Sequence, residues 1–461
     1  MTSSATLKTS AAGGFGEKGF EAFLKGRDEP NWLVDRRKKA FEALKAANLP
    51  TMRDEEWRRT DIRALKLDQF APPIHYEASI EARNALAEAH RTLDKSYATG
   101  CVHVNSVLTE TPDPTKLGGA TFVDLNQAVK DHADLLKRFL MSESAYPLRE
   151  DLFSSLHAAF WTGGTLLYVP KGVKVAAPLY ELVGLADAGK VDMSHCLIVL
   201  EEGSEATFVR ETIGASREQS QALHVGAVEI FVGPGAKLWF VNIQNWDDRT
   251  WHFSRERASV DREGAIQWTV GALGSRLSKV NQDVALAGEA SRAQVNGVMF
   301  TSGRQHLAYF TRQDHQAPHA TSDLLYKGGL KDSSRIVWKG MIRVEKEAQK
   351  TDAYQKNDSL LLSQAARADS IPGLEIEAND VRCTHGATAG QVDEDMVFYL
   401  CSRGIARETA VRLIVEGFFA KVHDRITLEP VRDALRDAVA RKLHGGGSAL
   451  QADGEIEIEE A

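Results

Sequence analysis

Short β-rich runs fill the middle of this chain, and they limit its fold more than any other feature. Between Thr165 and Glu345 such runs alternate with glycine, asparagine and aspartate, and no helix-length apolar period interrupts them. Many short strands separated by turns are typical of a sandwich, a propeller or a β-helix. Because we find no repeat of fixed length, periodicity alone leaves these three architectures open.

Helical patterns flank this β-rich region. Residues 17–162 are predicted to be mostly helical, for example where Leu125, Val129 and Leu136 follow Asp124, a residue that favours helix N-caps. We expect disorder in the Ser, Thr, Ala and Gly-rich residues 1–16, and in the glycine-run and acidic residues 445–461. The β core is therefore predicted over 163–392, followed by a C-terminal helical domain over 393–444.

The composition is that of a soluble globular protein. Of 461 residues, 43% are hydrophobic and 26% are charged, and no run of about 18 apolar residues could cross a bilayer. The N-terminus lacks the apolar core of a secretory signal, which predicts a cytoplasmic protein. The 4 cysteines are too scattered for a disulfide framework, and a net charge of -8 gives no reason to expect nucleic-acid binding.

Two apolar stripes at helical spacing end the folded part of the sequence. The first consists of Val411, Ile414, Val415, Phe418, Phe419 and Val422, and the second of Leu428, Val431, Leu435, Val439 and Leu443. The open end of a solenoid exposes strand edges, so this helix pair could form a lid. The same stripe geometry also suits docking of a partner, and both interpretations stay open.

Several familiar motifs do not apply here. Gly14, Gly16 and Gly19 match GxGxxG, but no strand precedes them, and no GxxxxGK[ST], HExxH or CxxC sequence occurs. His315 and His319 are four apart, yet Pro318 between them argues against a helix that would align them. We interpret both histidines as polar residues of a surface loop.

Cys383 and His385 are the strongest candidate functional pair. In an extended segment Val381, Cys383 and His385 share one face, with Arg382 and Thr384 on the other. A thiol and an imidazole can bind a soft metal or a cluster, but a cluster usually needs four ligands, so this one would be shared with another subunit. The alternative is packing inside a solenoid, with Cys383 as a small hydrophobe. Cys401 is a second thiol, within a helix expected to begin near Asp393.

Four separated segments resemble the SufB/SufD family of iron-sulfur cluster assembly scaffolds. They are LPTMRDEEWRRTDIRAL at 49–65, TLLYVPKGVKVAAPLY at 165–180, LIVLEEGSEATFVRE at 197–211, and the long run RADSIPGLEIEANDVRCTHGATAGQVDEDMVFYLCSRGI at 367–405. The resemblance covers most of the chain, and the last segment is the most specific. It implies a mainly β protein with a right-handed parallel β-helix, an N-terminal helical region and a C-terminal helical domain.

Within that family the CTHGAT sequence resembles the SufD branch. SufB differs there and presents a cysteine directly after its Phe-Tyr pair, whereas here Leu400 follows Phe398 and Tyr399, and Cys401 comes one place later. One residue turns a helical side chain by about 100 degrees, so we do not transfer the SufB role to Cys401.

What the resemblance implies is a non-enzymatic scaffold subunit that pairs with SufB through the β-helix ends and docks the ATPase SufC. His385 matches the family histidine implicated in the cluster site, with Cys383 as its neighbour, so a transient iron or iron-sulfur cluster would be shared with SufB. The SufC-docking face is expected on the C-terminal helices, at Val411, Ile414, Val415, Phe418, Phe419 and Val422. Nucleotide would be bound by SufC, not by this chain.

Two other functions are kept as alternatives. One is a metal-free adaptor of the same complex, in which Cys383 and His385 only pack at an interface. The other is a β-helix polysaccharide-active enzyme, which would usually need secretion and acidic residues stacked along a groove. The clearest acidic cluster of this chain lies in its C-terminal tail instead.

Overall fold

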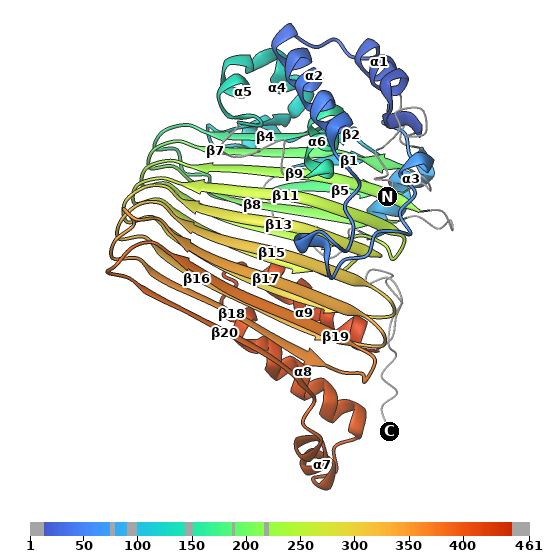
Figure 1. Ribbon diagram of the computed structural model, residues 1–461, viewed down its shortest axis with the longest axis vertical. Coiled ribbons are helices and arrows are strands. Elements are labelled where there is room, and N and C mark those ends of the chain that lie inside the picture. The colour runs from blue at the N-terminus through green and yellow to red at the C-terminus, as the bar shows by residue number, and fades with distance from the viewer. Residues whose placement is uncertain are drawn as a thin grey trace.

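The chain folds into a parallel β-solenoid built from two long sheets, as the computed structural model in Figure 1 shows. The structure describes residues 13–73, 79–89, 99–142, 151–186, 190–215 and 221–444. One sheet has the strand order β2-β1-β5-β8-β10-β12-β14-β16-β18-β20 and the other β19-β17-β15-β13-β11-β9-β7-β4-β3, with β6 beside β9. From β7 onward successive strands join alternate sheets, which is the path of a solenoid. Of the three architectures left open, the β-helix is therefore confirmed.

The strands are short and nearly equal in length along the body. Their bounds are β4 Gly163–Val169, β5 Leu179–Leu185, β6 Val191–Asp192, β7 Ser194–Leu200, β8 Glu205–Gly214, β9 Ala222–Val232, β10 Lys237–Asn245, β11 Thr250–Val260, β12 Ala265–Ala272, β13 Leu277–Leu286, β14 Arg292–Thr301, β15 His306–His315, β16 Thr321–Leu330, β17 Arg335–Val344, β18 Asp352–Leu361, β19 Arg367–Ile376 and β20 Arg382–Gln391.

One turn recurs in each coil and stacks on the same turn of the next. Its central residue has a positive φ, with glycine at Gly203 and Gly235 but Glu263 and Ala290 in the coils that follow. The backbone N–H of Gly203 donates to the carbonyl of Pro234, and that of Gly235 to the carbonyl of Arg262. Positive φ strains residues other than glycine, so these hydrogen bonds between coils help to hold the turn.

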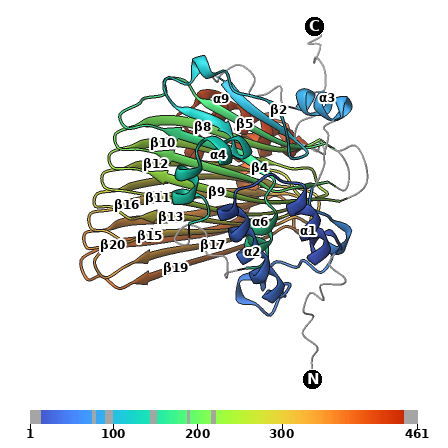
Figure 2. The ribbon, with the colours of Figure 1, turned by 90° about the horizontal axis from the view of Figure 1, so that it is seen from above.

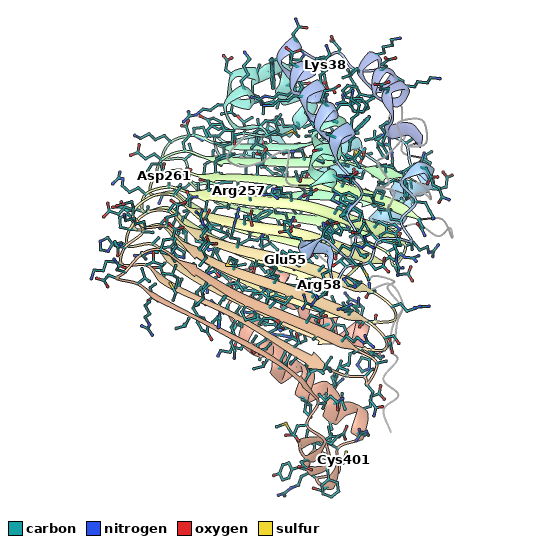
Figure 3. All side chains as sticks on the ribbon, in the orientation of Figure 1. Lys38, Glu55, Arg58, Arg257, Asp261 and Cys401 are labelled. Carbon is teal, nitrogen blue, oxygen red and sulfur yellow. The ribbon has the colours of Figure 1, made fainter. Side chains whose placement is uncertain are left out.

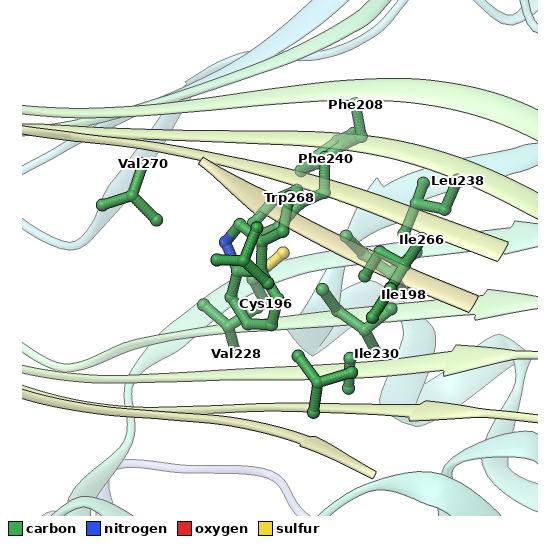
Figure 4. Packing of buried hydrophobic residues seen from close by; sticks show 14 of the residues in the cluster. Cys196, Ile198, Phe208, Val228, Ile230, Leu238, Phe240, Ile266, Trp268 and Val270 are labelled. Atoms are coloured by element: carbon green, nitrogen blue, oxygen red, sulfur yellow. The ribbon is translucent and has the colours of Figure 1, made fainter. Parts of the chain in front are cut away.

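Apolar side chains fill the interior along one side of the coils. Figure 4 shows Phe208, Phe240 and Trp268 from successive strands lying against Ile198 and Val228 of the facing sheet. The ring centroids of Phe208 and Phe240 are 6.2 Å apart, and those of Phe240 and Trp268 are 5.3 Å apart. Register places one apolar residue on the next, so this core is continuous along the solenoid.

An N-terminal helical layer covers the outer face of the second sheet. Phe153 and Phe253 stack with centroids 3.6 Å apart, and Phe15 packs edge-on against Phe160. Because Phe15 is buried, the fold begins before Glu17, where our prediction placed its start. The helices of the N-terminal region are η1 Gly13–Phe15, α1 Glu17–Lys25, α2 Asn31–Ala46, η2 Glu55–Trp57, η3 Leu67–Gln69, α3 Ile80–Ala89, η4 Pro114–Lys116, α4 Leu125–Asp131, α5 Ala133–Phe139 and α6 Leu152–Phe160. Of these, α3 packs on the first sheet, against β1 and β8.

Three strands within this N-terminal region were not predicted. They are β1 Thr99–Val104, β2 Val107–Glu110 and β3 Thr121–Asp124. β2 pairs antiparallel with β1, and β3 pairs antiparallel with β4, so they finish the two sheets at this end. The segments predicted to be disordered were residues 1–16 and 445–461, and all of them except residues 13–16 lie outside the described residues.

The C-terminal helices lie along the flank of the first sheet, on the side opposite to α1, α2 and α6 (Figure 2). Their bounds are α7 Glu394–Ser402, α8 Arg407–His423 and α9 Glu429–His444. α8 packs over β14 and β16 and α9 over β14, and Lys331 donates from Nζ to the carbonyl of Leu443 at 2.9 Å. The lid interpretation of these helices is wrong, because they cover a flank and leave the last coil exposed.

Candidate functional site

The last coil of the solenoid is formed by β19 and β20, and each is the final strand of its sheet among the described residues. Side chains that would be interior in an earlier coil are exposed here. Leu374 and Ile376 pair with the buried Ile342 and Val344 of β17, yet they are 38% and 41% exposed. This end therefore combines unpaired strand edges with an apolar surface, both of which call for a covering partner.

Cys383 and His385 lie in the mouth of this open coil. Register pairs Cys383 with Ala353 and His385 with Gln355, two side chains that are buried in the interior. The candidate pair thus continues an inward-facing column, which confirms the predicted shared face. Their Cα atoms are roughly 6.6 Å apart at the usual strand rise. His385 is exposed, so its ring can meet a neighbouring subunit.

Cys383 is half-buried and has an apolar environment. With Val381 it packs against Ile342, Val344 and Ala353. Burial, together with the nearby Asp352 carboxylate, raises the pKa of the thiol, while a hydrogen bond to the backbone of Ala353 partly offsets this. The thiol is protonated near neutral pH, so metal binding here would have to displace a proton.

The donor set at the mouth is small. Within the described ranges, no three His, Cys, Asp or Glu side chains are grouped closely enough to hold a metal ion. Cys401 is half-buried and belongs to α7, the helix that projects beyond the solenoid in Figure 3. Asp393 caps that helix by accepting from the N–H groups of Asp395 and Met396, as its position predicted. The mouth itself offers one thiol and one imidazole.

The predicted docking stripe on α8 needs a correction. Val415, Phe419 and Val422 are at most 1% exposed and pack against the solenoid through Val298 and Phe300. These three are structural, because a partner could not reach them without detaching the helix. Val411, Ile414 and Phe418 are only partly buried.

A different apolar surface lies on α7, and the prediction missed it. Phe398 is 74% exposed, Tyr399 56% and Met396 50%, and Leu413 in the second turn of α8 is 41% exposed. The signal was present in the sequence as a Phe-Tyr pair beside a capping aspartate. A groove of about 330 Å³ between α8 and α9 adds to this surface and is lined by Leu413, His423 and Val439 among others.

The interpretation of His315 as a loop residue is wrong. It ends β15 with its side chain buried in the interior, where Nε2 lies 2.8 Å from the hydroxyl of Ser322. Burial lowers its pKa to about 4, so it stays neutral. His319 does lie in a turn, with φ of 60°.

The structure thus defines a class of fold, a parallel β-solenoid with one open end and helices packed on its flanks. Residues 183–418 match the SufBD core domain of the SUF system for FeS cluster assembly, and residues 23–180 match the SufBD protein N-terminal region. The chain belongs to the SufBD family of iron-sulfur cluster assembly proteins, so the resemblance found in the sequence is confirmed.

Individual relatives agree with this family. An iron-sulfur cluster assembly SufBD family protein of Staphylococcus epidermidis is 27% identical over 420 residues, which cover 88% of each chain. The iron-sulfur cluster assembly protein SufD of Bacillus subtilis is 27% identical over 431 residues, covering 92% of this chain and 97% of that protein. No helix in the described part of the chain is long and apolar enough to span a membrane.

Proposed function

We propose that this chain is the SufD-type scaffold subunit of a cytoplasmic SufBCD complex, without catalytic activity of its own. Support comes from the family match, from the similarity to SufD of Bacillus subtilis, and from the CTHGAT sequence on the last strand. The observation that carries the proposal is the exposure of His385 at an otherwise interior position.

In this proposal the open coil is the surface that pairs with SufB. The unpaired edges of β19 and β20 can continue into the sheets of a second solenoid, and Leu374 and Ile376 become buried in the process. Pairing places His385 opposite ligands of SufB. The cargo, an iron ion or a nascent iron-sulfur cluster, is then held by His385 and the partner, with Cys383 as an auxiliary ligand.

SufC would dock on the other exposed surface, formed by α7 and the accessible part of α8. Phe398 and Tyr399 supply aromatic anchors on α7, and the partly buried Val411, Ile414 and Phe418 lie on α8. α7 directly follows β20, so movement of SufC during its ATP cycle could be transmitted to the mouth through Val392 and Asp393. Nucleotide binds to SufC in this scheme.

His385→Ala in the co-expressed complex tests this proposal. We expect the complex to assemble normally and to lose bound iron and acid-labile sulfide after anaerobic isolation. Thr384→Ala is the matched control, because Thr384 lies next to His385 but points to the outside of the coil. Wild-type iron and sulfide in the His385 variant would remove that ring from the mechanism.

The packing of Cys383 favours a metal-free adaptor as a second candidate function. Its contacts with Ile342 and Val344 are those of a small hydrophobe. If Cys383→Ala and His385→Ala both leave cluster content unchanged but weaken the association with SufB, the adaptor is the correct function.

A further inference from the structure

The amide of Gln355 braces the interior directly behind the mouth. Gln355, on β18, is completely buried, and its Nε2 donates to the backbone carbonyls of Gly340 on β17 at 3.4 Å and of Gly373 on β19 at 3.1 Å. An added Cβ at Gly340 would lie 2.5 Å from Oε1 of this amide, so the glycine leaves the room that the amide fills. One side chain therefore links three of the last strands.

These contacts fix the orientation of the amide. Carbonyl oxygens only accept hydrogen bonds, so the atom that faces them must be Nε2, and Oε1 is left on the other side. Oε1 is buried and has no hydrogen-bond partner in the part of the chain that the structure describes. A buried acceptor without a donor is destabilising, so this atom calls for a partner.

Strand register places an imidazole next to Gln355 in its inward-facing column. The neighbours of Gln355 in this column are Leu324 on β16, which has no side-chain donor, and His385 on β20. Adjacent strands lie about 4.8 Å apart, so rotation of the His385 ring about its Cα–Cβ bond can bring a ring N–H to Oε1.

The other side chains of this part of the interior are poorer donors. Gly340 and Pro372, which pair on β17 and β19, have no side-chain donor at all. The indole of Trp338 approaches Gly340, but its Nε1 makes no hydrogen bond to Gln355, and its ring is completely buried in the packed core. The ring of His385 is exposed and can turn.

A histidine that binds a metal through one ring nitrogen keeps a proton on the other. That N–H nearly always donates to a fixed acceptor, which sets the tautomer and directs the ligating nitrogen. Oε1 of Gln355 is an acceptor of this kind, because the two carbonyls on the far side of the amide hold it in place.

We propose that Gln355 is a positioning residue for His385. Its Oε1 accepts the hydrogen bond of one ring N–H, so the other ring nitrogen points to the partner and the cargo. This role rests on the proposed scaffold function, in which His385 is a ligand. It also gives a reason for burying an amide behind an open mouth, where an apolar side chain would pack equally well.

Cobalt(II) binding to the co-expressed complex, isolated anaerobically and freed of metal, tests this role. Co²⁺ accepts imidazole and thiolate ligands, and it shifts the proton NMR signals of the groups that bind it. We expect a shifted, solvent-exchangeable N–H signal that is absent from the H385A complex. In Q355A this N–H should exchange with water too fast to be observed, and the affinity for Co²⁺ should fall about tenfold.

N357A is the matched control. Asn357 is a second completely buried amide of β18 and also has an unpaired atom, Nδ2, but its register partner on β20 is Ala387. Truncation there should leave the N–H signal and the Co²⁺ affinity unchanged. Q355N guards against a folding defect, because it keeps a buried amide and only draws the acceptor back. It should also lose the N–H signal, while thermal unfolding stays close to that of the wild type.

The positioning role and the scaffold function fail in different ways. If the N–H signal and the Co²⁺ affinity are the same in the wild type, Q355A and Q355N, or if N357A removes the signal as well, the positioning role is overturned and the scaffold function stands. If the wild-type complex gives no Co²⁺ signal that depends on His385, the ring is not a ligand and both are overturned.

Discussion

The two ends of the solenoid share one strand pattern and finish it in opposite ways. At the N-terminal end, β2 and β3 turn antiparallel, and Leu117 and Ala120 from the segment between them join the interior core, so Cys101 and Phe122 are at most 1% exposed. At the C-terminal end the strands stop, and Leu374 and Ile376 stay exposed. The first end is completed by the chain itself, whereas the second has the composition of a core and the accessibility of a surface.

The largest effect on stability should come from truncating a buried side chain of the N-terminal helical layer, beside the covered end. Phe160→Ala removes a ring that packs against Phe15, Phe20, Phe23 and Phe41, and it should lower the free energy of unfolding by about 3–5 kcal/mol. Leu374→Ala at the open end should cost less than about 1 kcal/mol in the isolated chain. Chemical denaturation followed by tryptophan fluorescence measures both. Equal losses would mean that the two ends do not differ as described.

A smaller effect should appear with pH at the covered end. Burial raises the pKa of Glu229 to about 8, although the N–H of Met141 donates to its carboxyl at 2.6 Å. Between the ordinary pKa of 4.5 and about 8, the unfolded chain has released this proton and the folded chain keeps it. Stability therefore falls as pH rises through this window, by at most about 1.4 kcal/mol per pH unit.

Glu229→Gln should remove that part of the pH dependence and raise the thermal midpoint at pH 8 relative to the wild type. Glu375→Gln, at an exposed carboxyl of β19, is the control and should leave the profile as it is. Parallel profiles for Glu229→Gln and the wild type between pH 5 and pH 8 would contradict a protonated Glu229.

The smallest effect should concern association at the open end. Leu374→Asp places a charge where we propose that SufB packs, and it should weaken that association by about 1.4 kcal/mol, a tenfold loss of affinity. Leu413→Asp, on the α7–α8 surface, should leave SufB binding intact and weaken SufC binding. Pull-down titrations of each variant with SufB, and separately with SufC, distinguish the two effects. If Leu413→Asp weakened SufB binding instead, the assignment of SufB to the open coil and of SufC to the α7–α8 surface would be wrong.

Much of the fold could be predicted because it depends on local patterns. Strand alternation already placed Cys383 and His385 on one face, and Asp393 marked the start of α7. The coil repeat could not be found in the sequence, because successive coils repeat the backbone conformation of the turn and not its residue type. The same positive-φ turn holds glycine at Gly235 and glutamate at Glu263.

Other features depend on pairings between distant residues. The α8 stripe has the same spacing whether it packs on the solenoid or meets a partner, so only the fold shows that Phe419 is buried. Likewise, Gln355 and His385 are distant in sequence and become neighbours through strand register alone.

The stacked turns have a consequence for the dimensions of the molecule. Since each coil contacts chiefly the coils before and after it, one coil can be added or removed as a unit, and each adds about 4.8 Å along the axis. The number of coils thus sets the distance between the antiparallel strands β2 and β3 at one end and the mouth at the other.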